Sequence, residues 1–168
     1  MIIETERLYL RELVPEDKIN LMKVLSDPES MVYYPHPFSE QEVENWIFWN
    51  IENYKQYQHG LWAVILKKDE LFIGDCGITM QNIENETVPE IGFHIIKEYC
   101  NKGYATEAAR ACIEYAFNIL NYSRIFSYTT VKNIQSQKVA KKIGMQVYKK
   151  FNKNGEKQIV QVAYRNEL

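Results

Sequence analysis

The sequence predicts an α/β (α+β) fold, a single domain over residues 1–168 with a mixed, mostly antiparallel sheet of about seven strands flanked by about four helices. The length suits one domain with a sizeable core, and no repeat or linker divides the chain. Apolar residues alternate in some segments and recur at helical spacing in others, in the order β-α-α-β-β-β-α-β-α-β-β. Near the C-terminus, Asn154-Gly155 stands between two β-rich runs and is a strong signal for a tight hairpin.

The first half of the chain predicts a strand, two helices and three further strands. Pro15 suits the first turn of the first helix, and acidic residues lie beside its positive end. Ser39 and Glu42 have the spacing of a capping box at the start of the second helix. The helices are expected at 14–27 and 39–54, and the strands at 7–13, twice within 61–80 around a Lys-Lys-Asp-Glu turn, and at 88–96.

The second half predicts two helices and three strands. A helix follows Gly103, because the apolar residues from Ala108 to Leu120 fall on one helical face. A second, shorter helix would end at Gly144. The remaining elements are expected at 124–131 (strand), 134–144 (helix), 145–151 (strand) and 158–166 (strand).

The composition excludes several classes of protein. Hydrophobic residues make up 46% and charged residues 25% of the chain, as in ordinary soluble globular proteins. The first twelve residues carry three acids and two arginines, which argues against a signal peptide. No apolar run approaches the roughly 18 residues that cross a membrane. Three cysteines without CxxC spacing favour neither a disulfide framework nor a zinc site. We therefore expect a cytoplasmic protein that binds no membrane and no metal.

The net charge of −2 conceals an uneven distribution. Residues 1–100 hold 8 Lys and Arg against 18 Asp and Glu, whereas residues 101–168 hold 12 against 4. Either the two halves mix in the fold and the surface averages out, or one side meets a cation and the other a polyanion. Direct nucleic-acid binding is not expected, because the chain is slightly acidic and lacks an RNA-reading motif.

Gly103 lies where a polar turn leads into the alanine-rich helix. The first N–H groups of a helix have no partner inside it and, with the helix dipole, suit an anion such as phosphate. Gly103 would let the backbone approach a ligand closely, and Ala105 is small enough not to block it. A helix that simply starts after a glycine is the alternative. The seven glycines give neither G-x-G-x-x-G nor G-x-x-x-x-G-K, so a phosphate here would be bound in another way.

Four segments carry a resemblance to a known family: ETERLYLREL (4–13), EIGFHIIKEYCNKGYATEA (90–108), VKNIQSQKVAKKIGM (131–145) and the C-terminal hairpin. In this order they resemble the GNAT superfamily of N-acetyltransferases and, more narrowly, its branch of ribosomal-protein N-terminal acetyltransferases (Rim type). The similarity spans essentially the whole chain. It implies a GNAT-like fold, acetyl-CoA (coenzyme A) as co-substrate, and direct attack of an amine on the thioester without a metal or a covalent intermediate.

The resemblance also implies a loop for the pyrophosphate of coenzyme A. The family pattern is Gln or Arg, two variable residues, Gly, one variable residue, then Gly or Ala. The positions of this loop and the residue after it are Cys100, Asn101, Lys102, Gly103, Tyr104, Ala105 and Thr106. Cys100 departs from the pattern, and it is expected to fill the loop and not to act as a nucleophile.

Further cofactor contacts follow from the same resemblance. The strand that holds His94 and Ile95 would splay from the next strand and leave main-chain groups for the pantetheine arm, with an N–H as oxyanion donor. Asn133 matches a family asparagine that contacts the cofactor, although a helix N-cap would explain it equally. Lys142, with other lysines of the basic half, would meet the adenosine end.

The acid and the base are less clearly marked. Many family members have a tyrosine seven residues after the asparagine as the acid, and here that position is Ala140. The Rim branch instead has a serine, which is Ser136, and a first-turn serine without a catalytic role is the alternative. Glu90 and His94 are the candidates for the base, because positions i and i+4 of a strand share a face unless a bulge intervenes. A solvated strand end and a packed core histidine are the respective alternatives.

The acceptor is expected between the first two helices, in an aromatic and proline-stiffened loop. Tyr33, Tyr34, His36 and Trp49 are candidates to contact an ammonium group, whereas Trp46 is expected in the core. An α-amine titrates near pH ~8 and a lysine near ~10.4, so a site without an obvious strong base suits a peptide or protein N-terminus better. The alternatives are a small amine (a polyamine, amino acid or drug) and a non-catalytic acyl-CoA-binding module. The sequence leaves a homodimer open.

Overall fold

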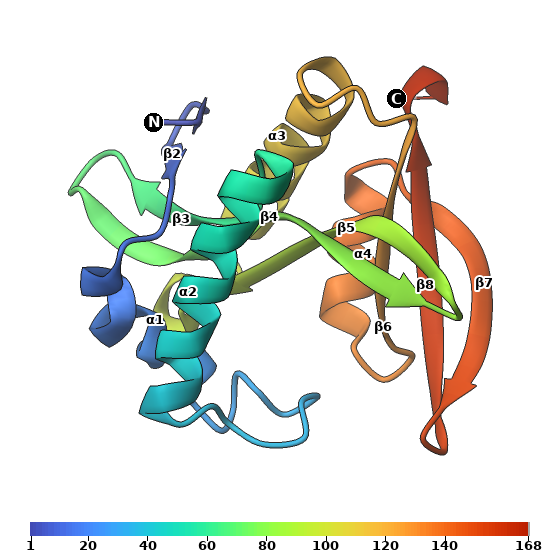
Figure 1. The fold of residues 1–168 in the computed structure, drawn as a ribbon, viewed down its shortest axis with the longest axis horizontal. Helices are drawn as coiled ribbons and strands as arrows, with labels where there is room; N and C mark the ends of the chain where they lie inside the picture. The colour runs from blue at the N-terminus through green and yellow to red at the C-terminus, as the bar shows by residue number, and fades with distance from the viewer. Residues whose placement is uncertain (168) are drawn as a thin grey trace.

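A computed structural model describes residues 1–167 and confirms the predicted α/β class (Figure 1). The helices are α1 (Lys18–Leu25), α2 (Glu40–Tyr57), α3 (Tyr104–Asn118) and α4 (Ile134–Lys142). The strands are β1 (Ile3–Glu4), β2 (Leu8–Arg11), β3 (Leu61–Leu66), β4 (Leu71–Ile83), β5 (Glu86–Ile95), β6 (Arg124–Thr130), β7 (Gln146–Lys153) and β8 (Glu156–Tyr164). Short 3₁₀ turns lie at Pro15–Asp17, Lys97–Tyr99 and Arg165–Glu167.

The strands form one sheet in the order β1-β2-β3-β4-β5-β6-β8-β7. Neighbouring strands are antiparallel except for β5 and β6, which are parallel. The described residues give eight strands where about seven were predicted. The additional one is β1, a two-residue strand in which Ile3 pairs with Leu10 of β2. Its pattern is too short to be recognised from sequence.

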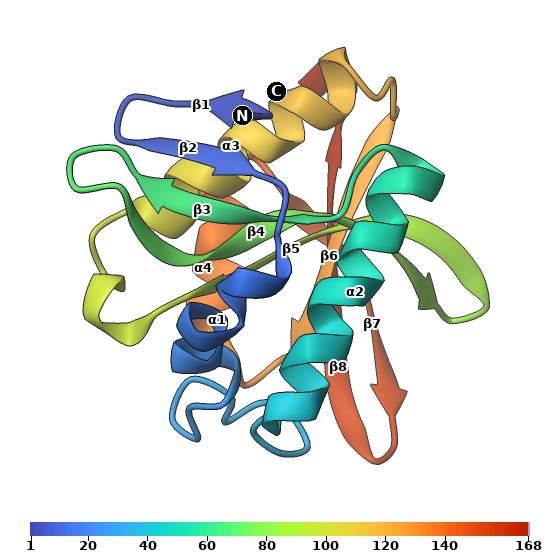
Figure 2. The same ribbon diagram turned by 60° about the vertical axis from the view of Figure 1, so that its left-hand side comes forward.

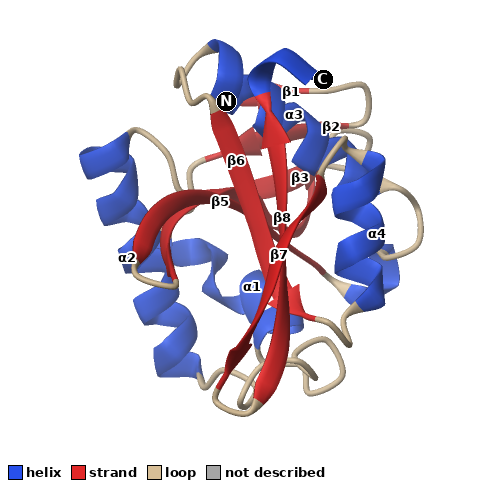
Figure 3. Cartoon of the chain, turned by 90° about the vertical axis from the view of Figure 1, so that its right-hand side faces the viewer, coloured by secondary structure: helices blue, strands red, loops and turns tan. Residues whose placement is uncertain are grey.

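Helices cover both faces of the sheet (Figure 2). The helices α1 and α2 pack on one face, against Ala63 and Ile65 of β3 among others, while α3 lies on the opposite face against Trp62 and Val64. Because successive side chains of a strand point to opposite faces, β3 reads as a continuous apolar run. In Figure 3 the strands lie between α2 on one side and α4 on the other.

Two local features differ from the prediction. The expected helix at 14–27 begins as a 3₁₀ turn and becomes α-helical only at Lys18, because the carboxylate of Asp17 accepts the N–H of Val14 (2.9 Å) and closes a tight turn there. The strands β4 and β5 form a long hairpin closed by Glu84 and Asn85, both with positive φ (48° and 69°). A turn that needs two left-handed residues usually holds glycine, and this turn has none, so the local turn signals did not predict the hairpin.

The parallel step of the sheet opens into a gap. Glu90 of β5 pairs with Phe126 of β6, and this is the single register pair between the two strands among the described residues. Beyond it, β5 stays paired with β4 as far as Ile95, and β6 stays paired with β8 as far as Thr130. The two strands therefore diverge toward their C-terminal ends, as the resemblance to the GNAT superfamily implied.

Within residues 1–167, no helix combines the length and the apolar character needed to span a bilayer.

Candidate active site

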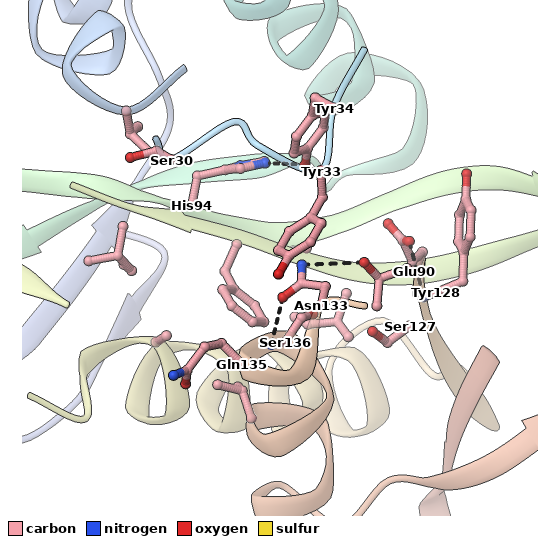
Figure 4. Close-up of a pocket in the computed structure, with 18 of the residues that line it drawn as sticks. Ser30, Tyr33, Tyr34, Glu90, His94, Ser127, Tyr128, Asn133, Gln135 and Ser136 are labelled. Atoms are coloured by element: carbon pink, nitrogen blue, oxygen red, sulfur yellow. Dashed lines mark hydrogen bonds between the residues drawn. The ribbon is translucent and has the colours of Figure 1, made fainter. Parts of the chain in front are cut away.

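A cavity of about 890 Å³ lies where β5 and β6 diverge. Its walls come from these two strands, from the N-terminal ends of α3 and α4, and from the segment between α1 and α2 (Figure 4). The site residues expected from sequence that line it are Tyr33, Tyr34, Glu90, His94, Ile95, Cys100, Asn101, Gly103, Tyr104, Ala105, Thr106, Asn133, Ser136 and Lys142. The cavity therefore collects residues that are far apart in the chain.

The N-terminus of α3 lies on one side of the cavity, and the loop and first helical turn expected to bind pyrophosphate, residues 100–106, are called the cradle below. Gly103 is the N-cap residue and adopts a left-handed conformation (φ 83°), and Asn101 two residues earlier also has positive φ (61°). The amides of Tyr104, Ala105 and Thr106 are in the first turn of the helix, where no intrahelical acceptor exists. With the positive end of the helix dipole, they fit the pyrophosphate of a coenzyme A molecule.

Arg7 fixes this cradle from outside the cavity. Its Nε donates to Oε1 of Glu107 (2.7 Å) and its Nη1 to the carbonyl oxygen of Lys102 (3.0 Å). The guanidinium also lies 4.3 Å from the ring centroid of Tyr104. Burial acts to raise the pKa of Glu107, but its hydrogen bonds from Thr5 and Arg7 lower it. Glu107 thus has its charge compensated beside a loop that would bind an anion.

Cations gather near the same helix end. A second hollow, of about 370 Å³, shares Gly103, Thr106 and Lys142 with the main cavity, and its other lining residues are two arginines and two glutamates: Arg7, Arg110, Glu6 and Glu107. Lys102, which the sequence placed among the cofactor residues, is exposed on the loop before α3 and does not line either hollow. Both halves of the sequence contribute to this basic surface, so the uneven charge along the chain is only partly preserved in the fold.

Asn133 and Ser136 bound the cavity at the start of α4. Oδ1 of Asn133 accepts the N–H of Ser136 (3.2 Å), and Nδ2 donates to Oγ1 of Thr129 (3.3 Å). The N-cap interpretation of Asn133 is therefore confirmed. The cap also holds the serine at the wall of the cavity (Figure 4).

Cys100 has the environment of a loop residue. Its thiol donates to the carbonyl oxygens of Ile95 (3.4 Å) and Ile96 (3.7 Å), which ties the loop to the end of β5. Burial of the thiol raises its pKa, and the nearby Glu98 raises it further. A thiol that resists ionisation is a poor nucleophile.

Glu90 places a carboxyl group at the point where the strands part. The side chain is half-buried and lines the cavity, and its Oε2 accepts the N–H of Tyr128 (3.4 Å). Burial raises the pKa of Glu90 to about 8, although the hydrogen bond from Tyr128 acts to lower it. A carboxyl group that titrates near neutral pH can accept a proton from an amine of similar pKa.

His94 lies on the same face of β5 as Glu90. The β4–β5 ladder runs without a register shift and pairs His94 with Asp75 and Glu90 with Thr79. The predicted common face is therefore confirmed. Nδ1 of His94 lies 2.7 Å from Oδ1 of Asp75, and its Nε2 lies 2.6 Å from the hydroxyl of Tyr34.

The segment between α1 and α2 crosses the cavity and is fixed at two points. The hydroxyl of Tyr33 donates to the carbonyl oxygen of Lys132 (3.1 Å), while the hydroxyl of Tyr34 meets His94 on the opposite wall (Figure 4). Burial raises the pKa of Tyr34, and the carboxylates of Glu90 and Asp75 raise it further. The two tyrosines bridge the diverging strands.

Two of the predicted acceptor residues lie away from the cavity. His36 is exposed and its Nε2 lies 2.9 Å from a carboxylate oxygen of Glu42, at the start of α2. Trp49 is on the outer side of α2, 37% exposed, with its ring 5.3 Å from that of Trp46. Trp46, which was expected in the core, is the tryptophan that lines the cavity.

Sequence reasoning did not identify three residues of the site. Asp75 pairs with the imidazole of His94, Trp46 donates to Asp75, and the N–H of Tyr128 donates to Glu90. Only Asp75 carried a signal, because an acid inside the apolar run LFIGDCGITM must be paired if it is buried. Within residues 1–167, no group of three or more His, Cys, Asp and Glu side chains is arranged to hold a metal ion.

Comparison with known proteins agrees with this geometry. Residues 7–146 match the family model described as the acetyltransferase (GNAT) domain. The Bacillus subtilis protein YkkB is 38% identical over 150 residues, which cover 89% of this chain and 87% of that protein.

Solved structures share the fold along almost the whole chain. A GNAT-family acetyltransferase from Bacillus anthracis has a TM-score of 0.85 at 28% identity and covers 99% of this chain and 100% of its own. A ribosomal-protein-S5-alanine acetyltransferase from Vibrio fischeri has a TM-score of 0.76 at 18% identity, with 98% and 96% covered. The family match spans most of the chain and includes the cradle, Glu90 and Ser136. The chain thus belongs to the GNAT family and is an acetyl-CoA-dependent N-acetyltransferase.

Proposed function

We propose that this N-acetyltransferase acetylates α-amines, with a peptide or protein N-terminus as acceptor and Glu90 as the general base. The observation that carries the proposal is the carboxyl group of Glu90, which lines the cavity and has a pKa raised to about 8. A peptide α-amine titrates near ~8, so proton transfer to this carboxylate is nearly balanced. A lysine amine titrates near ~10.4 and holds its proton more than two pKa units more tightly.

The cradle and the parted strands supply the cofactor half of this site. Backbone amides at the start of α3 would hold the pyrophosphate, with Lys102 and Lys142 near the adenosine end. Acetyl-CoA, when bound, supplies the thioester that the amine attacks. The main chain around His94 and Ile95 would donate a hydrogen bond to the negative charge that develops on the thioester oxygen.

Ser136 is the proposed acid. It lies in the first turn of α4 on the cavity wall, and Asn133 holds its backbone. A thiolate is a good leaving group and a weaker base than an alkoxide, so a hydrogen bond donated by the serine hydroxyl can assist its departure, and the hydroxyl regains from solvent any proton that it passes to the sulfur. The family tyrosine is absent at position 140, and Ala140 is buried there.

Aromatic and acidic groups support an amine in the other half of the cavity. Tyr33, Tyr34 and Tyr128 line it together with Glu90, so an ammonium group can be stabilised by cation–π contact and by a carboxylate. The named acceptor of the Vibrio fischeri structural neighbour, an alanine of a ribosomal protein, is of the proposed class.

One observation favours a second candidate, a polyamine. Glu156 of β8 also lines the cavity and accepts a hydrogen bond from Thr130 (3.0 Å), so Glu90 and Glu156 offer two carboxylates. Two ammonium groups of one small molecule could bind to such a pair.

The two candidate acceptor classes can be distinguished in a thiol-release assay at pH 8, near the pKa of Glu90. The acceptors are a peptide with a free N-terminus, the same peptide with a blocked N-terminus and one internal lysine, and spermidine. We expect turnover with the free N-terminus and little with the other two. Turnover restricted to spermidine or to the lysine peptide would refute the α-amine proposal. Calorimetric titration with acetyl-CoA, run in parallel, distinguishes a wrong acceptor from a protein that fails to bind the co-substrate.

A further inference from the structure

Asp75 is a buried carboxylate that no step of the proposed reaction has used. It lies in the middle of β4 with 0% of its surface exposed. An ion in such a position needs hydrogen-bond donors. Both oxygens have one: Oδ1 faces Nδ1 of His94 (2.7 Å) and Oδ2 accepts Nε1–H of Trp46 (3.1 Å).

The partners of Asp75 fix the tautomer of His94. An ionised carboxylate only accepts hydrogen bonds, so Nδ1 of the imidazole must carry the hydrogen. In the neutral ring Nε2 is then an acceptor, and the hydroxyl of Tyr34, 2.6 Å away, donates to it. The hydrogen bonds from Tyr34 through His94 to Asp75 therefore all run in one direction.

The acceptor nitrogen has to lose two protons during the reaction. An ammonium group loses one before it can attack, and the new N–C bond leaves a second to be removed. Glu90 can take the first, and it is then neutral. A second proton acceptor on the same face would complete the reaction, and the hydroxyl of Tyr34 lies at that face against His94.

We propose that Asp75 is a positioning residue of acetyl transfer, which holds His94 in the Nδ1–H tautomer so that Tyr34 and His94 can take the second proton from the acceptor nitrogen. The inference rests on the proposed function, because it needs the amine to bind between Glu90 and Tyr34. Trp46 supports the same role, since its indole fixes the orientation of the Asp75 carboxylate.

The step balances within these residues. A proton passes from the nitrogen to the oxygen of Tyr34 while the hydroxyl proton of Tyr34 passes to Nε2 of His94. The imidazole becomes an imidazolium that keeps its Nδ1–H bond to Asp75, and Asp75 stays ionised. Water then removes the proton from His94. No redox partner is required.

The groups that face this relay come from several elements. Glu90 of β5, Tyr128 of β6 and Asp75 of β4 act electrostatically on the hydroxyl of Tyr34. The ring of Phe38 packs against Tyr34 and the ring of Trp46 packs against His94. Neither Phe38 nor Trp46 is titratable. Glu90 is neutral once it has taken the first proton, so the carboxylate of Asp75 is the group that stabilises the imidazolium of His94.

The first test is the tautomer itself, read from the imidazole nitrogen chemical shifts in ¹⁵N NMR spectra of the protein without substrates. The chain has three histidines, so His94 is identified by comparison with a His94→Gln variant. His59 is an internal reference, because its Nδ1 donates to the carbonyl oxygen of Ile78 (2.7 Å) and its Nε2 accepts from Tyr122 (2.8 Å). We expect Nδ1–H at His94, and Nε2–H in the wild-type protein would overturn the proposal.

Asp75→Asn should reverse the tautomer. The asparagine oxygen must accept from Trp46, so its amide N–H₂ faces Nδ1 of His94 and drives the hydrogen to Nε2. We expect kcat to fall on the order of 10²-fold, with the Kd for acetyl-CoA unchanged. Asp69→Asn, the same change in the exposed β3–β4 turn, is the matched control and should leave both unchanged. A normal kcat in folded Asp75→Asn would contradict the proposal.

A double-mutant cycle separates positioning from structural support. Tyr34 lies on a surface segment, so Tyr34→Phe should fold even if Asp75→Asn does not, and it should lower kcat by a similar factor. If both residues act through one relay, the double variant is about as slow as the slower single variant. Independent effects that multiply would refute the relay. A protein that binds acetyl-CoA but acetylates no α-amine would refute the proposed function, while the tautomer measurement would still stand.

Discussion

Gly92 of β5 lies directly opposite Gly77 of β4, between the cross-strand pairs Asp75–His94 and Thr79–Glu90. The strand face that carries the two candidate proton acceptors therefore has no side chain between them. The two glycines differ in surroundings. A Cβ on Gly92 would meet only Leu61 and Glu90 side-chain atoms, at 3.6 and 3.8 Å, whereas a Cβ on Gly77 would lie 2.0 Å from the carbonyl oxygen of Gly60.

Gly92→Ala should therefore fold normally and fill the floor of the acceptor site. We expect the KM for the amine to rise about tenfold, in line with the 1–3 kcal/mol that one methyl group can decide in a fitted pocket, and the Kd for acetyl-CoA to stay unchanged. Gly77→Ala is the contrasting variant, because its Cβ collides with backbone and should lower the melting temperature. If Gly92→Ala leaves the KM unaltered, the amine does not bind over this face.

Glu90→Gln should remove the base without changing the shape of the site. We expect kcat/KM to fall on the order of 10²-fold at pH 8. In the wild-type protein kcat/KM should rise with pH and level off above the Glu90 pKa of about 8. The amine's own titration is common to both proteins, so the difference between their pH profiles reports Glu90. Glu114→Gln, on the exposed side of α3, is the matched control, and equal profiles for wild type and Glu90→Gln would exclude Glu90 as the base.

The same carboxyl group makes the fold less stable as the pH rises. Glu90 titrates near ~4.3 when the chain is unfolded but at about 8 in the folded protein, so the folded state holds more protons between these values. The contribution of Glu90 to the free energy of unfolding is fully present below the unfolded-state pKa of ~4.3. It is lost as the pH rises through the folded-state pKa of about 8. We expect the melting temperature of the wild type to fall more than that of Glu90→Gln between pH 5 and 8, measured by calorimetry. If the melting temperatures of the wild type and of Glu90→Gln fall by the same amount, the pKa of Glu90 is not raised.

The role of Gly103 in the cradle can be tested by comparing Gly103→Ala with the same substitution at a glycine of similar backbone conformation outside the site. Gly103 (φ 83°) and Gly155 of the β7–β8 turn (φ 78°) both occupy the left-handed region, and a Cβ would meet nothing within 4 Å at Gly155. Alanine at either position should cost about 1–2 kcal/mol of stability. Only Gly103→Ala should raise the Kd for acetyl-CoA, because it turns the amides of α3 away from the phosphate. Equal affinities in the two variants would exclude Gly103 from the cofactor site.

Periodic and turn signals sufficed for most of the fold. The capping box at Ser39 and the Asn154-Gly155 hairpin are present as predicted, because each depends on neighbouring residues alone. The Glu84-Asn85 turn was missed because its left-handed residues are imposed by the long ladder between β4 and β5. Local sequence contains no trace of such a tertiary constraint.

The site was predictable where a backbone motif makes it and less so where distant side chains meet. The helix start at Gly103 was predictable, since a glycine before an alanine-rich helix has a local meaning, whereas its expected role in binding pyrophosphate came from the family resemblance and stays a prediction. The pairing of Asp75 with His94 depends on strand register, and that of Trp46 with Asp75 depends on how α2 packs on the sheet. His36 and Trp49 were chosen by residue type, and in the structure both are exposed and neither lines the cavity.

Arg7 joins the cofactor loop to the N-terminal strands, so its replacement should weaken cofactor binding without touching the acceptor side. Arg7→Ala removes the hydrogen bond to the carbonyl oxygen of Lys102 and leaves the half-buried Glu107 with a negative charge beside the cradle. We expect the Kd for acetyl-CoA to rise about tenfold, the effect of losing ~1.4 kcal/mol, with the KM for the amine unchanged. Arg124→Ala breaks a comparable ion pair, with Glu86 at 2.7 Å, and serves as control.

Adding Glu107→Gln to Arg7→Ala should restore part of the affinity for acetyl-CoA, because the uncompensated negative charge of Glu107 is then gone. Failure of this rescue would mean that Arg7 acts through Lys102 and Tyr104 alone.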